Sequence, residues 1–186
     1  MKPKTIFLIV GRPGSGKTST AREIDIENIT HYSIGGMYRN ISTEKSELAK
    51  IVKKHIDNGE IVPIDIAKNV INNFLEKGSK MIIIDGFPRS LKQAEMFNNL
   101  MQTDKYSLKK VIEIVADDEI AFKRISGRKR GIDDNKELFE HRMNIYNKDI
   151  NKIRDYYEQK NIYTKINGNF QLEIVVENLK KILLSA

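Results

Sequence analysis

A glycine-rich loop near the N-terminus constrains the fold of this chain more than any other feature. Residues 11–18 read Gly-Arg-Pro-Gly-Ser-Gly-Lys-Thr, which matches the phosphate-binding pattern Gly-x-x-x-x-Gly-Lys-Ser/Thr. The loop follows the apolar run Thr5–Val10, which is typical of a strand buried on both faces, and it precedes a helical segment. An ordinary glycine-rich turn is the alternative. The coincidence of strand, spacing, lysine and hydroxyl favours a phosphate-binding loop.

The residue types in this loop suit the chemistry of a nucleotide. The three glycines let the backbone turn its N–H groups toward phosphate oxygens, and the following helix directs its positive end at the same point. Lys17 is placed to bridge the β- and γ-phosphates. Thr18 is the candidate hydroxyl ligand of Mg²⁺, and Asp85, which ends another predicted strand, is the candidate carboxylate beside that ion.

The rest of the sequence predicts a doubly wound α/β fold. Further β-rich apolar runs lie at residues 29–33, 81–84, 110–115 and 161–166. Helical patterns separate them, the clearest of which has Ala67, Val70, Ile71, Phe74 and Leu75 on one face and ends at Lys77-Gly78. Strands that alternate with helices predict a five-stranded parallel sheet between two helical layers. With no internal repeat or linker in its 186 residues, the chain is expected to form one domain.

Composition limits the location and the partners of the protein. Its 32 Lys and Arg residues against 25 Asp and Glu give a net charge of +7, which indicates an anionic partner but does not choose among nucleic acid, a membrane surface and nucleotide phosphates. No apolar run approaches the ~20 residues of a membrane span, and the run at residues 5–10 is too short for a signal peptide. The absence of cysteine excludes disulfides and thiolate zinc sites. We therefore expect a cytoplasmic protein with no membrane partner.

A second group of residues is expected to face the phosphate loop. The segment Asp85-Gly-Phe-Pro-Arg89 follows a predicted strand, and open α/β sheets bind their ligands at the carboxyl ends of their strands. Arg89 is therefore expected to point at the site, although a solvated loop arginine is the alternative. Residues 33–39 follow another predicted strand, and residues 59–63 form a turn before a helix. Both segments can reach the same edge of the sheet.

These motifs resemble those of nucleoside monophosphate kinases, most closely the short-lid adenylate kinases, over nearly the whole chain. The family's phosphate loop Gly-x-Pro-Gly-x-Gly-Lys is present at residues 11–17, and its Asp-Gly-Phe-Pro-Arg segment at residues 85–89. Its Gly-x-Leu-Val-Pro turn is similar to residues 59–63, and its Thr-Gly-Asp-x-x-Arg segment resembles residues 34–39. The resemblance implies a three-layer P-loop kinase with a core (1–33, 78–123 and 132–186), a helical flap for the monophosphate (about 34–77) and a short lid (about 124–131).

The resemblance also implies which residues bind each nucleotide. Those implied for ATP are Gly11, Pro13, Gly14, Ser15, Gly16, Lys17, Thr18, Ser19, Arg124 and Arg128. Those implied for AMP are Ile34, Gly35, Arg39, Glu60, Ile61, Val62, Gly86, Phe87, Pro88, Arg89, Gln93, Arg130 and Arg142. Arg39 and Arg89 would clamp the acceptor phosphate. The catalytic set, which would spread the charge of the transferring phosphoryl group, is Lys17, Arg89, Arg124, Arg128 and Arg142.

Gln93 is expected to select the acceptor base. It lies four residues after Arg89, where adenylate kinases have a glutamine whose amide can both accept from and donate to adenine. Kinases of UMP and CMP usually have Phe-Pro-Arg-Asn, whereas residues 87–90 here read Phe-Pro-Arg-Ser. Taken alone, without its neighbours, a glutamine at this position is more often an exposed helix residue. Adenine is favoured, and a UMP or CMP kinase is the alternative within the family.

Arg142 interrupts an otherwise apolar helix face. Asp134 and Glu137 form a capping box for a helix that is predicted to run to about Gln159. The residues that share its face with Arg142 are Phe139, Tyr146, Ile150, Ile153 and Tyr157. An arginine at an apolar position calls for an anionic partner, and a structural ion pair is one explanation. The family has an arginine here that meets the transferring phosphoryl group.

The basic turn at residues 121–131 and the start of the flap depart from the family pattern. The turn carries five positive residues and no acid, but acidic residues flank it, which favours a compact phosphate clamp over a nucleic-acid patch. It is about three residues shorter than the usual short lid, and Gly131 stands where an arginine is expected, so Arg130 is the candidate substitute. Ile34 and Gly36 replace a threonine and an aspartate near the acceptor, which leaves the affinity for AMP open.

These residues together predict an adenylate kinase that converts Mg·ATP and AMP into two ADP with no covalent intermediate. The attacking phosphate is already ionised, so no general base is needed, in keeping with three histidines that form no recognisable triad. Mg²⁺ is the expected cofactor, ATP and AMP are the expected partners, and the chain is expected to be monomeric and to bind no nucleic acid. The rival outside the class is a non-catalytic nucleotide-binding or nucleic-acid-binding module.

Overall fold

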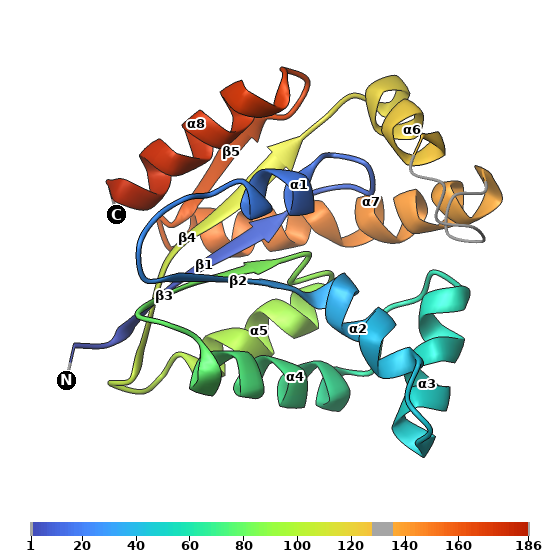
Figure 1. Ribbon diagram of the computed structural model, residues 1–186, viewed down its shortest axis with the longest axis horizontal. Coiled ribbons are helices and arrows are strands. Elements are labelled where there is room, and N and C mark those ends of the chain that lie inside the picture. Colours follow the sequence, from blue (N-terminus) through green and yellow to red (C-terminus); the bar gives the residue numbers. More distant parts are fainter. Residues whose placement is uncertain (1, 128–135, 186) are drawn as a thin grey trace.

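The computed structural model, which describes residues 2–127 and 136–185, has a central parallel sheet (Figure 1). Its strands are β1 (Lys4–Val10), β2 (Ile29–Ser33), β3 (Met81–Asp85), β4 (Tyr106–Val115) and β5 (Tyr163–Asn167). Their spatial order is β2-β3-β1-β4-β5, and every neighbouring pair is parallel. The predicted α/β class, the five strands and the parallel pairing are therefore confirmed. β1 lies between β3 and β4, with β2 beyond β3 and β5 beyond β4. The winding direction of the sheet therefore changes at β1.

Helices connect the strands and cover both faces of the sheet. They are α1 (Lys17–Arg22), α2 (Ile34–Ser42), α3 (Glu47–Asp57), α4 (Ile64–Lys77), α5 (Leu91–Leu100), α6 (Asp118–Ser126), α7 (Lys136–Glu158) and α8 (Leu172–Leu184). In Figure 1, α1 and α8 lie over one face and α4, α5 and α7 over the other. α2 and α3 lie at the carboxyl edge of the sheet, inside the segment predicted to be the flap; that functional division remains a prediction.

Two cores follow from the alternation of side chains along β1. Ile6, Leu8 and Val10 pack with apolar residues of α4, α5 and α7. Phe7 and Ile9 point to the other face and pack with residues of α1 and α8. A strand buried on both faces has no room for polar side chains, which is why β1 reads as a continuous apolar run.

Strand boundaries differ from the prediction at two places. β4 begins at Tyr106 rather than residue 110, because its first five residues are half-buried or exposed and include Ser107, Lys109 and Lys110, which interrupt the apolar pattern. Its pairing with β1 shifts register between Ile6 and Phe7. β5 begins at Tyr163 rather than residue 161, because Asn161 has a φ of 56° and turns the chain out of the sheet.

Local capping places the helices that lead into the site. The side chains of Ser33 and Ser90 accept hydrogen bonds from the backbone N–H groups of Gly36 and Gln93. α2 therefore begins directly at the carboxyl end of β2, and α5 begins after the loop 86–90 that follows β3. At the C-terminal end of α4, the ammonium group of Lys4 donates to the carbonyl oxygens of Leu75, Glu76 and Gly78, each at 2.8 Å. The capping box predicted for α7 includes Asp134, which lies outside the described residues.

Candidate active site

A cavity of about 190 Å³ opens at the carboxyl ends of β1, β2 and β3. We call it the central cavity. The predicted residues that line it are Gly11, Pro13, Gly14, Gly16, Lys17, Thr18, Gly35, Arg39, Glu60, Ile61, Asp85, Gly86, Pro88, Arg89 and Arg142. The fold thus brings together segments that lie up to 131 positions apart, from Gly11 to Arg142, at the sheet edge where the sequence placed them.

The phosphate loop wraps the floor of the cavity. Gly11, Gly14 and Gly16 all have positive φ angles, of 143°, 81° and 92°, a backbone conformation that favours glycine. A Cβ at position 14 would also lie 2.2 Å from the carbonyl oxygen of Ala121, so α6 packs on the loop too closely for any side chain. Lys17 donates from Nζ to the carbonyl oxygens of Gly11 and Arg12, each at 2.7 Å, which folds the lysine over the loop.

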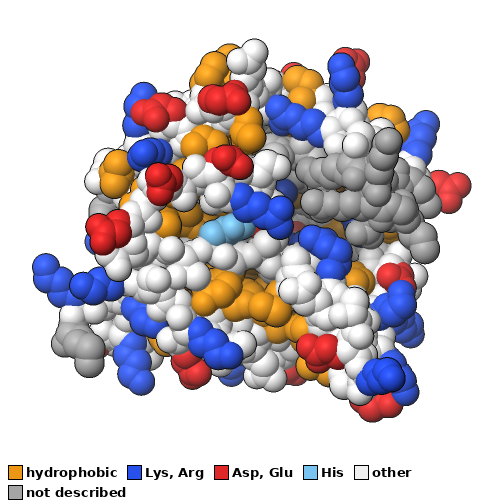
Figure 2. Space-filling model, viewed as in Figure 1, with side chains coloured by type: hydrophobic (Ala, Val, Ile, Leu, Met, Phe, Trp, Pro, Cys, Tyr) orange, Lys and Arg blue, Asp and Glu red, His pale blue; other side chains and the backbone are white. Residues whose placement is uncertain are grey.

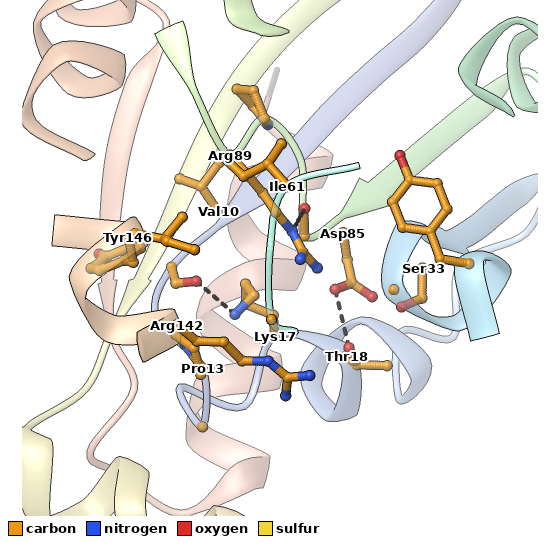
Figure 3. Close-up of a pocket in the computed structure, with 18 of the residues that line it drawn as sticks. Val10, Pro13, Lys17, Thr18, Ser33, Ile61, Asp85, Arg89, Arg142 and Tyr146 are labelled. Atoms are coloured by element: carbon orange, nitrogen blue, oxygen red, sulfur yellow. Dashed lines mark hydrogen bonds between the residues drawn. The ribbon is translucent and has the colours of Figure 1, made fainter. Parts of the chain in front are cut away.

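Asp85 occupies the centre of a hydrogen-bonded triplet at the end of β3. Its Oδ1 accepts from Thr18 at 3.1 Å (Figure 3), and its Oδ2 lies 2.8 Å from Nε2 of His31. Burial alone would raise the pKa of this carboxyl, which is only 2% exposed, but the contacts with His31, Lys17 and Thr18 outweigh it and lower the pKa below its usual value. Asp85 is therefore ionised at neutral pH.

The pairing with His31 was not predicted. β2 and β3 pair in parallel with Ser33 opposite Asp85, so His31, two residues earlier, projects on the same face of β2 as Ser33. His31 could be read from the sequence, but the order of the strands could not. Only the pairing of β2 with β3 brings His31 next to Asp85.

Cations dominate the charged groups of the central cavity. Its described lining has Lys17, Arg39, Arg89 and Arg142 against Asp85 and Glu60. Figure 3 shows the side chains of Lys17, Arg89 and Arg142 around the same cavity, with Lys17 turned back toward the phosphate loop. Like charges so placed repel one another in a low-dielectric cleft unless an anion lies between them.

Two of these guanidinium groups meet over the first turn of α2. A Cβ at position 35 would lie 3.4 Å from Nη2 of Arg89 and 3.6 Å from Nη1 of Arg39. Arg89 is oriented by a hydrogen bond from its Nε to the carbonyl oxygen of Gly86 at 3.0 Å. A glycine at position 35 leaves open the space into which both groups point.

Arg142 reaches the cavity from α7, on the face that the sequence predicted. Phe139, Ile150, Ile153 and Tyr157 on that face are buried, while Arg142 itself is half-buried. Its Nη2 donates to the carbonyl oxygen of Ile56 at 3.4 Å, and a Cβ at position 59 would lie 3.1 Å from its Cγ. The end of α3 therefore packs against the arginine of α7 across the cavity.

Seven of the residues predicted for AMP line a small pocket beside the central cavity. The small pocket is a narrow recess with no room for a water molecule in this structure, and it is formed by Ile34, Tyr38, Ile61, Val62, Gly86, Phe87, Arg89 and Gln93. Gln93 is 3% exposed, which excludes the exposed alternative, and its Oε1 accepts from the backbone N–H of Arg89 at 2.8 Å. Ile34, Val62 and Phe87 are buried and supply apolar walls. Tyr38 was not predicted.

Three other predicted ATP residues lie away from the cavity surface. Arg124 donates to the carbonyl oxygens of Gly168 at 2.7 Å and Phe170 at 3.3 Å, and it also contacts Ser15 O at 3.5 Å. It therefore joins α6 to the loop that precedes α8 and to the phosphate loop. Ser15 is buried at 1% exposure, and Ser19 does not line the cavity. Arg128 and Arg130 lie outside the described residues.

The buried carboxylate of Glu113 positions Tyr146 in one wall of the central cavity. This role was not predicted from the sequence. Glu113 of β4 is 1% exposed and accepts hydrogen bonds from Tyr146 and Tyr163, each at 2.5 Å, and from Arg154 at 3.1 Å. Tyr146 lines the central cavity one helical turn after Arg142. The signal was a glutamate inside an apolar strand run, which requires buried donors around it.

Two properties of the described residues bear on the predicted partners. Over residues 2–127 and 136–185, no helix is long and apolar enough to cross a membrane. Within the same residues, no group of three or more His, Asp or Glu side chains forms a ready metal cage. On the face in Figure 2, the described Lys and Arg side chains are interspersed with Asp and Glu.

Comparison with known proteins gives one consistent result. The family model described as "Adenylate kinase" matches residues 9–162. Over 185 residues the chain is 41% identical to the adenylate kinase of Campylobacter jejuni subsp. doylei and 38% identical to that of Nautilia profundicola, with 97% of this chain and 96% of each relative covered. The adenylate kinase of Campylobacter lari is 40% identical over 184 residues, which cover 97% of both chains.

Proposed function

Because the chain belongs to the adenylate kinase family, we propose that the central cavity holds ATP on the phosphate loop and AMP against Arg39 and Arg89. The chain is an ATP-dependent phosphotransferase that transfers the terminal phosphoryl group of ATP to AMP and gives two ADP, reversibly. The observation that carries the assignment of the two positions is that the guanidinium groups of Arg39 and Arg89 both lie beside Gly35, in the same cavity that Lys17 lines.

In the proposed mechanism the residues act by position and charge. An oxygen of the AMP phosphate attacks the γ-phosphorus, a new O–P bond forms, and the bond from that phosphorus to the β,γ-bridging oxygen breaks, with its electrons left on ADP. Lys17 supports the β- and γ-oxygens, and Arg89 and Arg142 stabilise the charge that develops between donor and acceptor. The acceptor phosphate is already ionised, so no side chain has to remove a proton.

The residues at the end of β3 fit a magnesium ion that accompanies ATP. Mg²⁺ takes oxygen ligands and keeps several waters, so it needs only one or two protein groups besides the phosphates. The Thr18 hydroxyl and the ionised Asp85 carboxylate are adjacent oxygens at the mouth of the phosphate loop. When bound, the ion would neutralise charge on the β- and γ-phosphates.

Further roles remain proposals for the same reaction. Arg124 would support ATP from behind the phosphate loop, where it already contacts Ser15 and Gly168. Arg128 and Arg130 would complete the charge around the transferring group from the short lid. We also propose that the protein works as a cytoplasmic monomer. We propose that it binds no nucleic acid, since basic and acidic side chains are interspersed on the face shown in Figure 2.

Calorimetric titration tests the two positions directly. Arg39→Ala and Arg89→Ala should each weaken AMP binding by about tenfold or more while ATP binding changes far less. Arg22→Ala is the matched control, because Arg22 is an exposed arginine at the end of α1 that does not line the cavity. Equal losses for both nucleotides in the Arg39 and Arg89 variants would refute the assignment.

A further inference from the structure

Tyr38 carries a buried hydroxyl that finds no hydrogen-bond partner in the described part of the chain. The side chain is only 3% exposed, and its ring belongs to the apolar core beside α4. A hydroxyl in such a place has lost its hydrogen bonds to water and received none in return, which costs free energy. Phenylalanine would fill the same core without that cost.

The position of Tyr38 connects the two spaces of the site. It lines the central cavity, which contains the cationic side chains, and also the small pocket, which contains Gln93. Burial raises the pKa of Tyr38 to about 12, although the nearby charge of Arg89 opposes the shift. The hydroxyl is therefore neutral at physiological pH and can both donate and accept.

The surrounding helix offers few alternatives for polar recognition. Ile34, Gly35, Gly36 and Met37, the first four residues of α2, carry no nitrogen or oxygen in their side chains. Ser33, which precedes them, already accepts a hydrogen bond from Gly36 as the helix cap. Tyr38 is thus the first residue of α2 that can present a polar side-chain atom to a nucleotide.

We infer that the Tyr38 hydroxyl hydrogen-bonds a polar group of the acceptor nucleoside, either the ribose 2′-hydroxyl or the 6-amino group of the base, and so helps to select AMP. This inference rests on the acceptor site proposed above. In that site the phosphate would lie with the cations of the central cavity and the base toward Gln93, so the nucleoside would pass Tyr38, which lines both pockets. A bound AMP would provide the partner that the folded chain lacks, and an acceptor without the matching group would leave the hydroxyl unpaired.

The test is Tyr38→Phe, which removes one oxygen and keeps the ring. The KM for AMP should rise about tenfold, while kcat and the KM for ATP stay within about twofold. The midpoint of thermal unfolding without nucleotide should not fall, because the lost hydroxyl had no partner. An unchanged KM for AMP overturns the inference, and so does a lower midpoint with equal losses for AMP and ATP, which would indicate a structural role.

Tyr157→Phe is the matched control. The Tyr157 hydroxyl is also buried without a partner in the described residues, but Tyr157 lines neither the central cavity nor the small pocket. This variant should resemble Tyr38→Phe in thermal unfolding and the wild type in its KM for AMP. A similar rise in the KM for AMP would overturn the inference, because the effect would then not depend on the site.

Acceptor analogues identify the group that is contacted. With dAMP, which lacks the 2′-hydroxyl, or with purine riboside monophosphate, which lacks the 6-amino group, the effect of Tyr38→Phe should shrink for the analogue without the contacted group. Equal tenfold effects on both analogues and AMP would overturn a contact with either group. Gln93→Leu in the same assays separates failure of the Tyr38 inference from failure of the proposed acceptor site. If Gln93→Leu raises the KM for AMP and Tyr38→Phe does not, only the Tyr38 inference fails. If neither variant changes the KM for AMP, the acceptor site itself is wrongly placed.

Discussion

Gln93 and Arg89 are joined by a hydrogen bond in which the backbone N–H of Arg89 donates to the side-chain oxygen of Gln93 at 2.8 Å. The residue predicted to read the base therefore also fixes the backbone of the residue proposed to hold the acceptor phosphate. In this arrangement Oε1 of Gln93 accepts one hydrogen bond from the protein, so its second lone pair and the amino group of the same amide remain for adenine. Recognition of the base and placement of the phosphate are thereby coupled.

Gln93→Leu should consequently affect both binding and turnover. It removes the amide and leaves the Arg89 N–H without its acceptor, so AMP should lose about 1–3 kcal/mol of binding and kcat should fall as well. UMP, which the amide does not match, should change little. Steady-state kinetics with AMP and UMP check this; unaltered AMP parameters would contradict the role of Gln93.

Lys17→Ala should abolish turnover while the fold survives. The lysine extends over the phosphate loop and should matter most when charge develops on the β- and γ-oxygens, so kcat should fall by about a thousandfold or more. Circular dichroism establishes that the variant is folded, and Lys92→Ala, at an exposed position of α5, is the control. Near-normal rates in a folded Lys17→Ala protein would contradict the assignment of the loop.

The sequence allowed the strands, the phosphate loop and the cationic residues to be predicted because each has a local signal. A continuous apolar run predicts β1, and the glycine spacing predicts the loop that follows it. His31, Glu113 and Tyr38 could not be assigned in this way, because their surroundings come from other elements. The partner of His31 depends on strand order, and the donors to Glu113 come from α7 and β5.

Glu113→Gln should destabilise the protein in a pH-dependent manner. Burial alone would raise the pKa of Glu113, but hydrogen bonds from Tyr146, Tyr163 and Arg154 outweigh it and lower the pKa below 4.5. A carboxyl whose pKa is lower in the folded state stabilises that state fully above its unfolded pKa and loses this contribution as pH falls through the folded pKa. At pH 7 the variant should be less stable by about 3 kcal/mol.

The measurement is denaturant unfolding of wild type and Glu113→Gln between pH 7 and pH 3. The difference in free energy of unfolding should be constant above about pH 5.5 and shrink below about pH 4.5. Glu177→Gln is the control, since Glu177 forms only an exposed pair with Lys181 and should change stability little at any pH. A difference for Glu113→Gln that does not depend on pH would show that ionisation of Glu113 does not contribute.

Lys4→Met should lower stability without changing the kinetics. The ammonium group of Lys4 donates to three carbonyl oxygens at the end of α4, where the helix dipole is negative. Its loss should cost about 1–3 kcal/mol in free energy of unfolding. Lys2→Met, at an exposed neighbouring lysine, should cost nearly nothing. Equal stability of the two variants would mean that the three contacts contribute no net free energy.

The most direct test of the whole account is the initial rate of phosphoryl transfer from Mg·ATP to AMP, dAMP, UMP and CMP, with the products identified. We expect AMP to have the highest kcat/KM, by about tenfold or more over the pyrimidine acceptors, and two ADP to form for each AMP consumed. A higher kcat/KM for UMP or CMP, or no ADP from ATP and AMP, would contradict it.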